Sequence, residues 1–236
     1  ENDYNTMDID FMESVWWVFK ELWSKGLIYQ DYKVLPYSWA ASTPLSNFEA
    51  NMDYRDVEDP SIYFTLDARD NYKKIIKGDK FLVWTTTPWC IPGNLAIAVG
   101  KEIEYSRISI KNNFYWIATE RLSEMNDYDL EIVDVSYGED LIGATYIPAY
   151  NEYEHLFKEG AFRIIHSEDT NTESGSGLVS QAPAYGESDF YSLKNANIDV
   201  IADPVTLSGR FDSTFKELNG LNVKDADKLI MDQLEA

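Results

Sequence analysis

The segment WTTTPWCIPGNLAIAV, residues 84–99, joins two apolar runs of the kind that form buried strands. Three threonines, two prolines and a Gly-Asn pair lie between these runs. If the first strand continues, side-chain alternation places Thr85 and Thr87 on one face and Thr86 on the other. The prolines remove backbone donors and fix φ, so the connection is expected to be stiff. Such a turn, lined with hydroxyl groups, is typical either of a pocket for a polar ligand or of a β-turn that has no binding function.

A second informative segment, GSGLVSQAPAYGESDFY, covers residues 175–191. Its first two glycines, Gly175 and Gly177, allow the backbone to approach a ligand closely. Asp189 falls at the start of a helix expected over residues 188–195. Capping and the helix dipole favour a carboxylate there whether or not it has a function. Both interpretations of Asp189 are therefore open at this point.

The two segments together resemble the signatures of the editing (CP1) domain of isoleucyl-tRNA synthetase, which the valyl and leucyl enzymes share. Residues 84–94 resemble its threonine-rich signature, called here the threonine signature. Residues 175–191 resemble its glycine-rich strand followed by Ala-Pro and an aspartate, called here the glycine signature. Residues 44–48 and 209–227 look most like the isoleucyl enzyme of eukaryotic cytosolic type. The resemblance implies an α+β fold, β-rich and barrel-like, with peripheral helices.

The resemblance also implies roles for individual residues. Asp189 would anchor the α-ammonium group of an aminoacyl ester through a charge-assisted hydrogen bond, and would not act as a general base. Thr86 or Thr87 would help to hold the hydrolytic water, and these two residues complete the expected catalytic set. The expected substrate-binding residues are Thr85, Trp89, Asn94, Gly177, Ser180, Ala182 and Tyr185. Fixation of the turn by Asn94, and packing of Ala182 and Tyr185 in the core, are the alternatives.

Two residues depart from the family pattern. Ser180 stands where the family usually has histidine, and serine is smaller and carries no charge near neutral pH. We expect this change to alter the rate or the selectivity of the reaction. Either the pocket is larger and admits isoleucine, or a neighbouring side chain fills the space. Cys90 stands where threonine is more common, and no His-Asp pair is arranged around it, so it is not expected to be a nucleophile. His155 and His166 are expected at the surface or at strand ends.

The resemblance, with a turn-rich link that ends near residue 47, implies three parts of the chain. Residues 1–47 are expected to connect to the catalytic body of a synthetase, residues 48–222 to form the editing domain, and residues 223–236 to form a helix returning to that body. The first part contains an amphipathic helix from Phe11 that ends near Gly26. Hairpin turn residues are expected at 112–113. The expected strands are 61–66, 80–84, 95–99, 105–110, 114–119, 130–135, 145–147, 160–165 and 177–179.

The composition is that of a folded protein without a disulfide. The chain has 236 residues, of which 44% are hydrophobic and 14% aromatic, with one cysteine and two histidines. These counts exclude an internal disulfide and make a Cys-cluster or multi-His metal site unexpected. No metal or cofactor is expected for the hydrolysis, and ATP and Mg are expected only in a synthetic domain.

No apolar run reaches the roughly 20 residues that cross a bilayer. Without an initiator Met the chain reads as a fragment, and we expect it to act in the cytoplasm.

The net charge of −21 opposes a free-standing RNA binder, which would need a basic face. The lysine cluster, defined as Lys73, Lys74, Lys77 and Lys80, is expected to be an exposed turn before a strand. We therefore expect the remainder of the synthetase to hold most of the tRNA(Ile). This chain would receive only the 3′-terminal adenosine and its amino acid. Weak RNA affinity, no membrane partner and a monomeric state are expected.

The sequence therefore predicts hydrolytic proofreading, in which valyl-tRNA(Ile) is cleaved to valine and tRNA. Two other functions are open. A degenerate editing fold would only dock the tRNA end or support the synthetase. An unrelated acidic, aromatic-rich module would bind carbohydrate, and the resemblance of both signatures to an editing domain would then be a coincidence.

Overall fold

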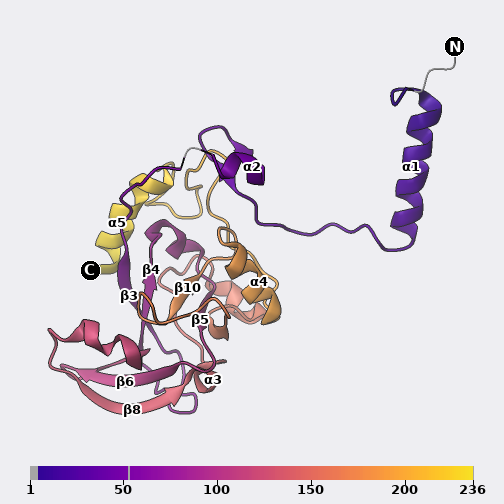
Figure 1. The fold of residues 1–236 in the computed structure, drawn as a ribbon. Helices are drawn as coiled ribbons and strands as arrows, with labels where there is room; N and C mark the ends of the chain where they lie inside the picture. Colours follow the sequence, from indigo (N-terminus) through magenta and orange to yellow (C-terminus); the bar gives the residue numbers. More distant parts are fainter. Residues whose placement is uncertain (1–4, 53, 236) are drawn as a thin grey trace. The chain divides into compact units, whose positions relative to one another are not determined.

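The computed structural model describes residues 5–52 and 54–235, and the chain divides into two compact units, Glu1–Lys33 and Val34–Ala236. The first unit contains helix α1 (Ile9–Ser24), which has no buried residue (Figure 1). The helix ends as predicted, because Gly26 takes a left-handed φ of 68° and its N–H donates to the carbonyl of Trp23. The apolar face of α1 is exposed.

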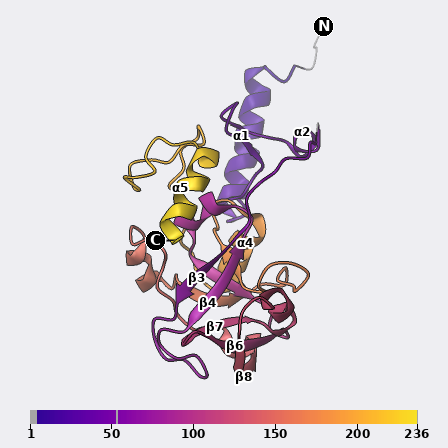
Figure 2. The same ribbon diagram turned by 90° about the vertical axis from the view of Figure 1, so that its left-hand side faces the viewer.

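The second unit is a curled mixed sheet with short helices around it (Figures 1 and 2). Its strands are β1 (Tyr37–Ser38), β2 (Thr43–Pro44), β3 (Ile62–Asp67), β4 (Lys80–Thr85), β5 (Ala96–Val99), β6 (Glu104–Ile110), β7 (Asn113–Ala118), β8 (Glu131–Tyr137), β9 (Arg163–His166) and β10 (Val179–Gln181). Its helices are α2 (Asn47–Ala50), α3 (Gly138–Leu141), α4 (Glu187–Asn195) and α5 (Val223–Glu235), with 3₁₀ helices η1 (Pro88–Gly93), η2 (Thr119–Met125) and η3 (Glu154–Glu159).

The strand order of the large sheet is β8-β6-β7-β4-β10-β5-β9, with β3 paired to β4. Strands β1 and β2 form a separate two-stranded sheet. The open order and the curl make a half-barrel, which confirms the predicted β-rich α+β class. None of the described helices is long and apolar enough to cross a bilayer.

Strand β4 organises the site because it has three neighbours. β3 lies antiparallel along all of β4, from Ile62↔Thr85 to Asp67↔Lys80. On the other edge, the start of β4 pairs with β7 and its end pairs with β10, both in parallel. The β10 contact sets Val179 opposite Trp84. The sheet therefore brings the glycine signature directly beside the threonine signature, although about 90 residues separate them.

A buried polar cluster fixes the other end of β4. Asp79, which precedes β4, is 2% exposed and accepts two hydrogen bonds from Arg107 of β6, at 2.8 and 2.7 Å. The indole N–H of Trp116 in β7 donates to the same carboxylate at 3.1 Å. The Arg107 guanidinium also lies 4.0 Å from the ring centroid of Phe114. One carboxylate thus joins three elements of the sheet.

Most of the predicted strands are present, and four details differ. β9 begins at Arg163, three residues after the predicted start, because Gly160 and Phe162 have positive φ. Residues 145–147 form only isolated bridges, to Ala68 and Arg163, rather than a strand. β10 begins at Val179, two residues after the predicted start, because Gly177 has a φ of 75° that a strand does not adopt. The hairpin turn lies at 111–112 rather than 112–113, with both φ values positive as a type I′ turn requires.

The lysine cluster is part of a network of surface ion pairs. Lys73 pairs with Asp140, Lys74 with Asp134 and Lys80 with Asp67, at nitrogen–oxygen distances of 2.7–2.8 Å. Carboxylates therefore neutralise three of its four charges, as expected for a structural turn. The predicted boundary near residue 47 lies within the second unit. That residues 1–47 connect the domain to the catalytic body of a synthetase stays a prediction.

Candidate active site

The threonine signature leaves β4 as the sequence predicted. Thr85 is buried and Thr87 half-buried, whereas Thr86 is exposed. The hydroxyl oxygens of Thr85 and Thr87 lie 3.3 Å apart, and the backbone N–H of Thr87 donates to the Thr85 hydroxyl at 3.2 Å. The chain then enters η1 through Pro88, which has no N–H to satisfy. The result is a fixed turn that presents one hydroxyl, that of Thr86, to solvent.

Asn94, at the end of this signature, forms hydrogen bonds within the protein through both its side-chain NH₂ group and its side-chain carbonyl. Its Nδ2 donates to the carbonyl of Ala96 at 2.8 Å and to the hydroxyl oxygen of Ser180 at 2.9 Å. Its Oδ1 accepts from the hydroxyl of Tyr146, a fully buried residue, at 2.6 Å. These contacts support the alternative in which Asn94 fixes the turn. They also orient Ser180, so the predicted contact of Asn94 with substrate stays a prediction.

The glycines of the second signature serve internal packing. A Cβ on Gly175 would lie 2.6 Å from the Trp84 ring, and one on Gly177 would lie 2.4 Å from the Cβ of Ala118. Both have positive φ. Arg121 of η2 donates from Nε to the carbonyl of Gly175 at 2.9 Å and so holds the loop before β10. Packing explains both glycines, and an approach to a ligand stays a prediction for Gly177.

Asp189 lies in the first turn of α4, but it does not cap that helix. Its Oδ2 accepts from the backbone N–H of Ala182 at 2.8 Å, across the bend that precedes α4. Gly186 allows this approach, because a Cβ there would lie 2.7 Å from the carboxyl carbon of Asp189. Desolvation raises the pKa of the Asp189 carboxyl, and the Ala182 N–H and the Ser188 hydroxyl oppose that shift in part.

The Asp189 carboxylate has no cation beside it in the described part of the chain. None of the ion pairs formed by residues 5–52 and 54–235 includes Asp189. The nearest charge that affects its pKa is another carboxylate, Asp169, which raises it further. A partly buried anion in this setting attracts a cationic group, and an ammonium ion fits that requirement.

Side chains join the two signatures at several points. Besides the bond from Asn94 to Ser180, the rings of Trp89 and Tyr185 lie 4.8 Å apart between centroids. The hydroxyl of Tyr185 donates to Asp203 at 3.1 Å. Ala182 is buried at the end of β10. Trp89, Ser180, Ala182 and Tyr185 are thus brought together, as walls of one region.

Cys90 lies in the same turn but is not suited to nucleophilic attack. Burial raises the pKa of its thiol to about 12, and the charges of Asp189 and Asp227 oppose its ionisation as well. In the described residues no group of three His, Cys, Asp or Glu side chains could hold a metal ion. The polar groups that the two signatures present here are hydroxyls, a carboxylate and backbone amides.

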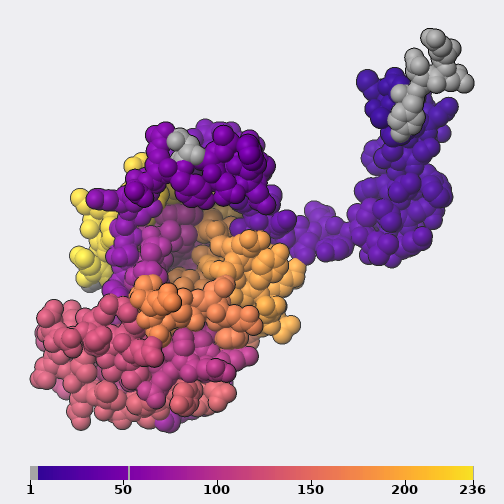
Figure 3. Space-filling model, viewed as in Figure 1, coloured from indigo at the N-terminus to yellow at the C-terminus, as the bar shows by residue number. Residues whose placement is uncertain are grey.

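The surface around these residues is hollowed. Figure 3 shows a recess in the second unit between the purple segment that contains α2 and the orange segment that contains α4. Viewed from the same side in Figure 1, β4, β10 and α4 are drawn around this recess. Within the two signatures Thr86 is exposed and Trp89, Tyr185 and Asp189 are half-buried, so a ligand can reach these side chains.

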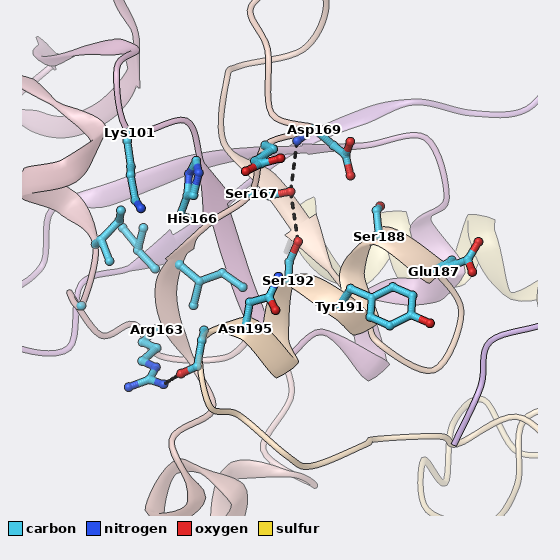
Figure 4. Close-up of a pocket in the computed structure, with 16 residues that line it drawn as sticks. Lys101, Arg163, His166, Ser167, Asp169, Glu187, Ser188, Tyr191, Ser192 and Asn195 are labelled. Carbon is cyan, nitrogen blue, oxygen red and sulfur yellow. Dashed lines mark hydrogen bonds between the residues drawn. The ribbon is translucent and has the colours of Figure 1, made fainter. Parts of the chain in front are cut away.

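A separate cavity lies between β9 and α4 (Figure 4). Its volume is about 710 Å³, and Lys101, His166 and Tyr191 are among its lining residues. Within it the Ser192 hydroxyl donates to the Ser167 hydroxyl at 3.0 Å. None of the predicted site residues lines this cavity. It therefore borders the glycine signature, through Glu187, Ser188 and Tyr191, without including the predicted site residues.

Sequence reasoning missed the residues that hold the site from a distance. Tyr146 fixes Asn94, and Asp227 of α5 accepts from the backbone N–H of Trp89 at 2.8 Å. Gly186 makes room for the Asp189 carboxyl. Only Gly186 lies within a signature, so for the other two the sequence offers no local signal.

A family model for class I tRNA synthetases (I, L, M and V) matches residues 1–202. The chain belongs to this family. Among curated relatives, it is similar to the isoleucine–tRNA ligases of Protochlamydia amoebophila (43% identity, 98% of this chain) and Bdellovibrio bacteriovorus (43%, 100% of this chain). It is also similar to a probable cytoplasmic isoleucine–tRNA ligase of Dictyostelium discoideum (40%, 96% of this chain). This class I synthetase chain spans 22% of the length of each of these relatives.

The fold of the class I chain is also known from a solved structure. GlLeuRS-CP1 superposes with a TM-score of 0.55 at 15% identity, covering 75% of this chain and 95% of that one. This likeness concerns the fold and confirms the predicted CP1 architecture. Bacterial and eukaryotic ligases match at similar identity, so the eukaryotic cytosolic type stays a prediction.

Proposed function

We propose that this chain is the editing domain of an isoleucine–tRNA ligase and hydrolyses valyl-tRNA(Ile). The observation that carries the proposal is the Asp189 carboxylate, which is partly buried and has no ion-pair partner in the described residues. Its charge acts on Cys90 of the threonine signature. The ligases to which the chain is similar, and its CP1 fold, support the same function.

Such an activity answers a physical limit of the synthetic reaction. Isoleucine and valine differ by one methylene, which a binding pocket can discriminate by only about 1–3 kcal/mol. A second site that hydrolyses the smaller ester supplies the remaining selectivity. The substrate of this site would be the 3′-terminal adenosine of tRNA(Ile) carrying valine.

In the proposed reaction Asp189 accepts hydrogen bonds from the α-ammonium of the valyl ester and so fixes its carbonyl. Thr86 or Thr87 helps to hold a water molecule, whose oxygen attacks the carbonyl carbon. The bond from that carbon to the ribose oxygen then breaks, and the proton of the water passes to the ribose oxygen. Valine and tRNA(Ile) leave. No metal, cofactor or covalent enzyme intermediate is needed, and ATP and Mg would serve only the synthetic part of the ligase.

The small side chain of Ser180 bears on selectivity. The Asn94 carboxamide holds its hydroxyl at 2.9 Å, so it is a fixed, uncharged group at this position. A site with serine here either keeps its selectivity for valine or admits isoleucine as well. The degenerate-fold alternative predicts binding of a stable aminoacyl-adenosine analogue without hydrolysis. Family membership removes the unrelated carbohydrate-binding module.

The proposal is tested by deacylation of valyl-tRNA(Ile) and isoleucyl-tRNA(Ile), by this chain and by the whole ligase that contains it. Asp189→Ala should lower kcat/KM for the valyl ester roughly 10- to 150-fold, because a hydrogen bond to a charged group contributes about 1.5–3 kcal/mol. Asp199→Ala, a change at an exposed aspartate beyond α4, is the control and should leave the rate unchanged. Undiminished hydrolysis by Asp189→Ala would remove Asp189 from the mechanism.

The partners follow from the same proposal. The rest of the ligase would bind the body of the tRNA and this chain its aminoacylated end. The domain is proposed to act as a monomer in the cytoplasm, by analogy with the cytoplasmic relative of Dictyostelium discoideum.

A further inference from the structure

Helix α5 lies against the turn that carries the threonine signature. Figures 1 and 2 both draw the yellow α5 beside the magenta turn that follows β4. Asp227 lies on the inner side of α5 and is 5% exposed. Its Oδ1 accepts from the backbone N–H of Trp89 at 2.8 Å. This contact joins residues 138 positions apart.

The Trp89 N–H needs a partner from outside its own turn. The first N–H groups of a helical segment have no acceptor within it. In η1 the flanking Thr87 side chain makes no capping bond, and Pro88 has no N–H. Cys90 already donates to the carbonyl of Thr87 at 2.9 Å. Asp227 therefore supplies the acceptor that the start of η1 lacks.

Independent contacts hold α5 in place. The ammonium of Lys224 lies 2.6 Å from a carboxylate oxygen of Asp59, and the hydroxyl of Tyr150 donates to Gln233 at 2.7 Å. Ala226 and Ile230 are fully buried. α5 is thus a fixed support, and Asp227 transmits its position to the backbone of η1.

The position of Trp89 matters to both signatures. Thr87 lies two residues before it, and its ring contacts Tyr185 of the glycine signature. A shift of the Trp89 backbone would therefore move the expected water-holding threonines relative to Asp189. Misplacement of reacting groups by about 1 Å can lower a rate about 100-fold.

We propose that Asp227 is a positioning residue, which holds η1 by its hydrogen bond to the Trp89 N–H and thereby sets the threonine signature for hydrolysis. This inference rests on the proposed function. Asp227 lies outside residues 1–202, which the family model matches, and in neither signature. Its function would be to accept this hydrogen bond. Burial raises the pKa of its carboxyl, and the Trp89 N–H and the Lys224 ammonium oppose that shift in part.

The test compares four variants of the 236-residue chain. Asp227→Ala removes the acceptor, Asp227→Asn keeps an oxygen acceptor without charge, and Asp227→Glu keeps the charge but displaces the oxygens. Asp225→Ala, at an exposed aspartate on the same helix, is the control. The measurements are single-turnover hydrolysis of valyl-tRNA(Ile) at saturating protein and amide hydrogen exchange of Trp89 by NMR.

We expect Asp227→Ala and Asp227→Glu to lower the rate constant about tenfold or more and to accelerate Trp89 exchange by a similar factor. Asp227→Asn and Asp225→Ala should keep both at the parent values. Should the alanine variant not fold, the contrast between Asn and Glu decides alone. A parent-like rate in Asp227→Glu, or an equal loss in Asp227→Asn, would overturn the inference.

The two proposals can fail separately. A parent chain that leaves valyl-tRNA(Ile) intact, within the whole ligase as well, would remove the proposed function and with it a positioning role in that reaction. Unchanged Trp89 exchange in Asp227→Ala, in a chain whose parent hydrolyses the ester, would overturn the positioning role and leave the proposed function standing.

Discussion

At the scale of single residues, burial in the folded protein disfavours the ionised form of Asp189. Desolvation raises the pKa of its carboxyl above that of an unfolded chain. This group therefore contributes stability below its unfolded-state pKa, and that contribution is lost as the pH rises through the raised folded-state pKa. We predict that Asp189→Asn, which cannot ionise and keeps an acceptor for the Ala182 N–H, raises the unfolding midpoint at pH 7. The gain should shrink as the pH falls through the pKa of Asp189.

Urea unfolding of the parent and the variant at a series of pH values from 7 down to 4 measures this difference. Asp199→Asn, at an exposed position, should show no such gain. A gain of the same size at every pH would mean that ionisation of Asp189 is not its source. A residue that weakens the fold in this way is typical of functional sites.

The same scale shows which site residues a sequence can reveal. The alternation of Thr85, Thr86 and Thr87 depends only on the local strand, and the structure agrees with it. The partners of Asn94 and Trp89 come from 52 and 138 residues away. No pattern within a window of the chain encodes such contacts, because tertiary folding brings them together.

At the scale of elements, the Asp79 cluster joins the start of β4 to β6 and β7. Asp79 and Arg107 are both almost fully buried. Removal of one partner leaves a buried charge unpaired, so we predict that Asp79→Ala lowers the free energy of unfolding by about 3–5 kcal/mol. Joint replacement by Asp79→Leu and Arg107→Met should recover most of that loss, because neither charge then remains.

Chemical denaturation of the single and double variants measures these free energies. Lys74→Ala is the matched control, since its pair with Asp134 is about half exposed and should contribute less than about 1 kcal/mol. A double variant as unstable as Asp79→Ala would show that packing, and not the unpaired charge, dominates at this site.

Strand prediction succeeded where apolar residues alternate or run continuously, as in β4 and β5. It was least accurate where glycine sets the backbone. β10 starts late because Gly177 is left-handed, and residues 145–147 contact their neighbours only through single bridges. The sheet order was not predictable, because the parallel pairing of β4 with β10 joins segments that no short turn connects.

At the scale of the whole molecule, the net charge of −21 limits how the chain can meet RNA. Carboxylates pair with Lys73, Lys74 and Lys80, so the lysine cluster offers little charge to phosphates. Affinity for nucleic acid falls with salt in proportion to the number of phosphates that the protein neutralises. We predict that this chain binds tRNA(Ile) weakly, with a slope of log K against log salt of about −1 or shallower.

Titration of fluorescent tRNA(Ile) at several salt concentrations gives this slope. A stable valyl-adenosine analogue without phosphates is the control, and its binding should depend little on salt because Asp189 contacts an ammonium at short range. A steep slope for tRNA, near −5, would mean that a basic surface exists on this chain and that it binds the body of the tRNA itself. A shallow slope together with binding of the analogue places recognition in the site, because only the aminoacylated end then needs to enter the protein.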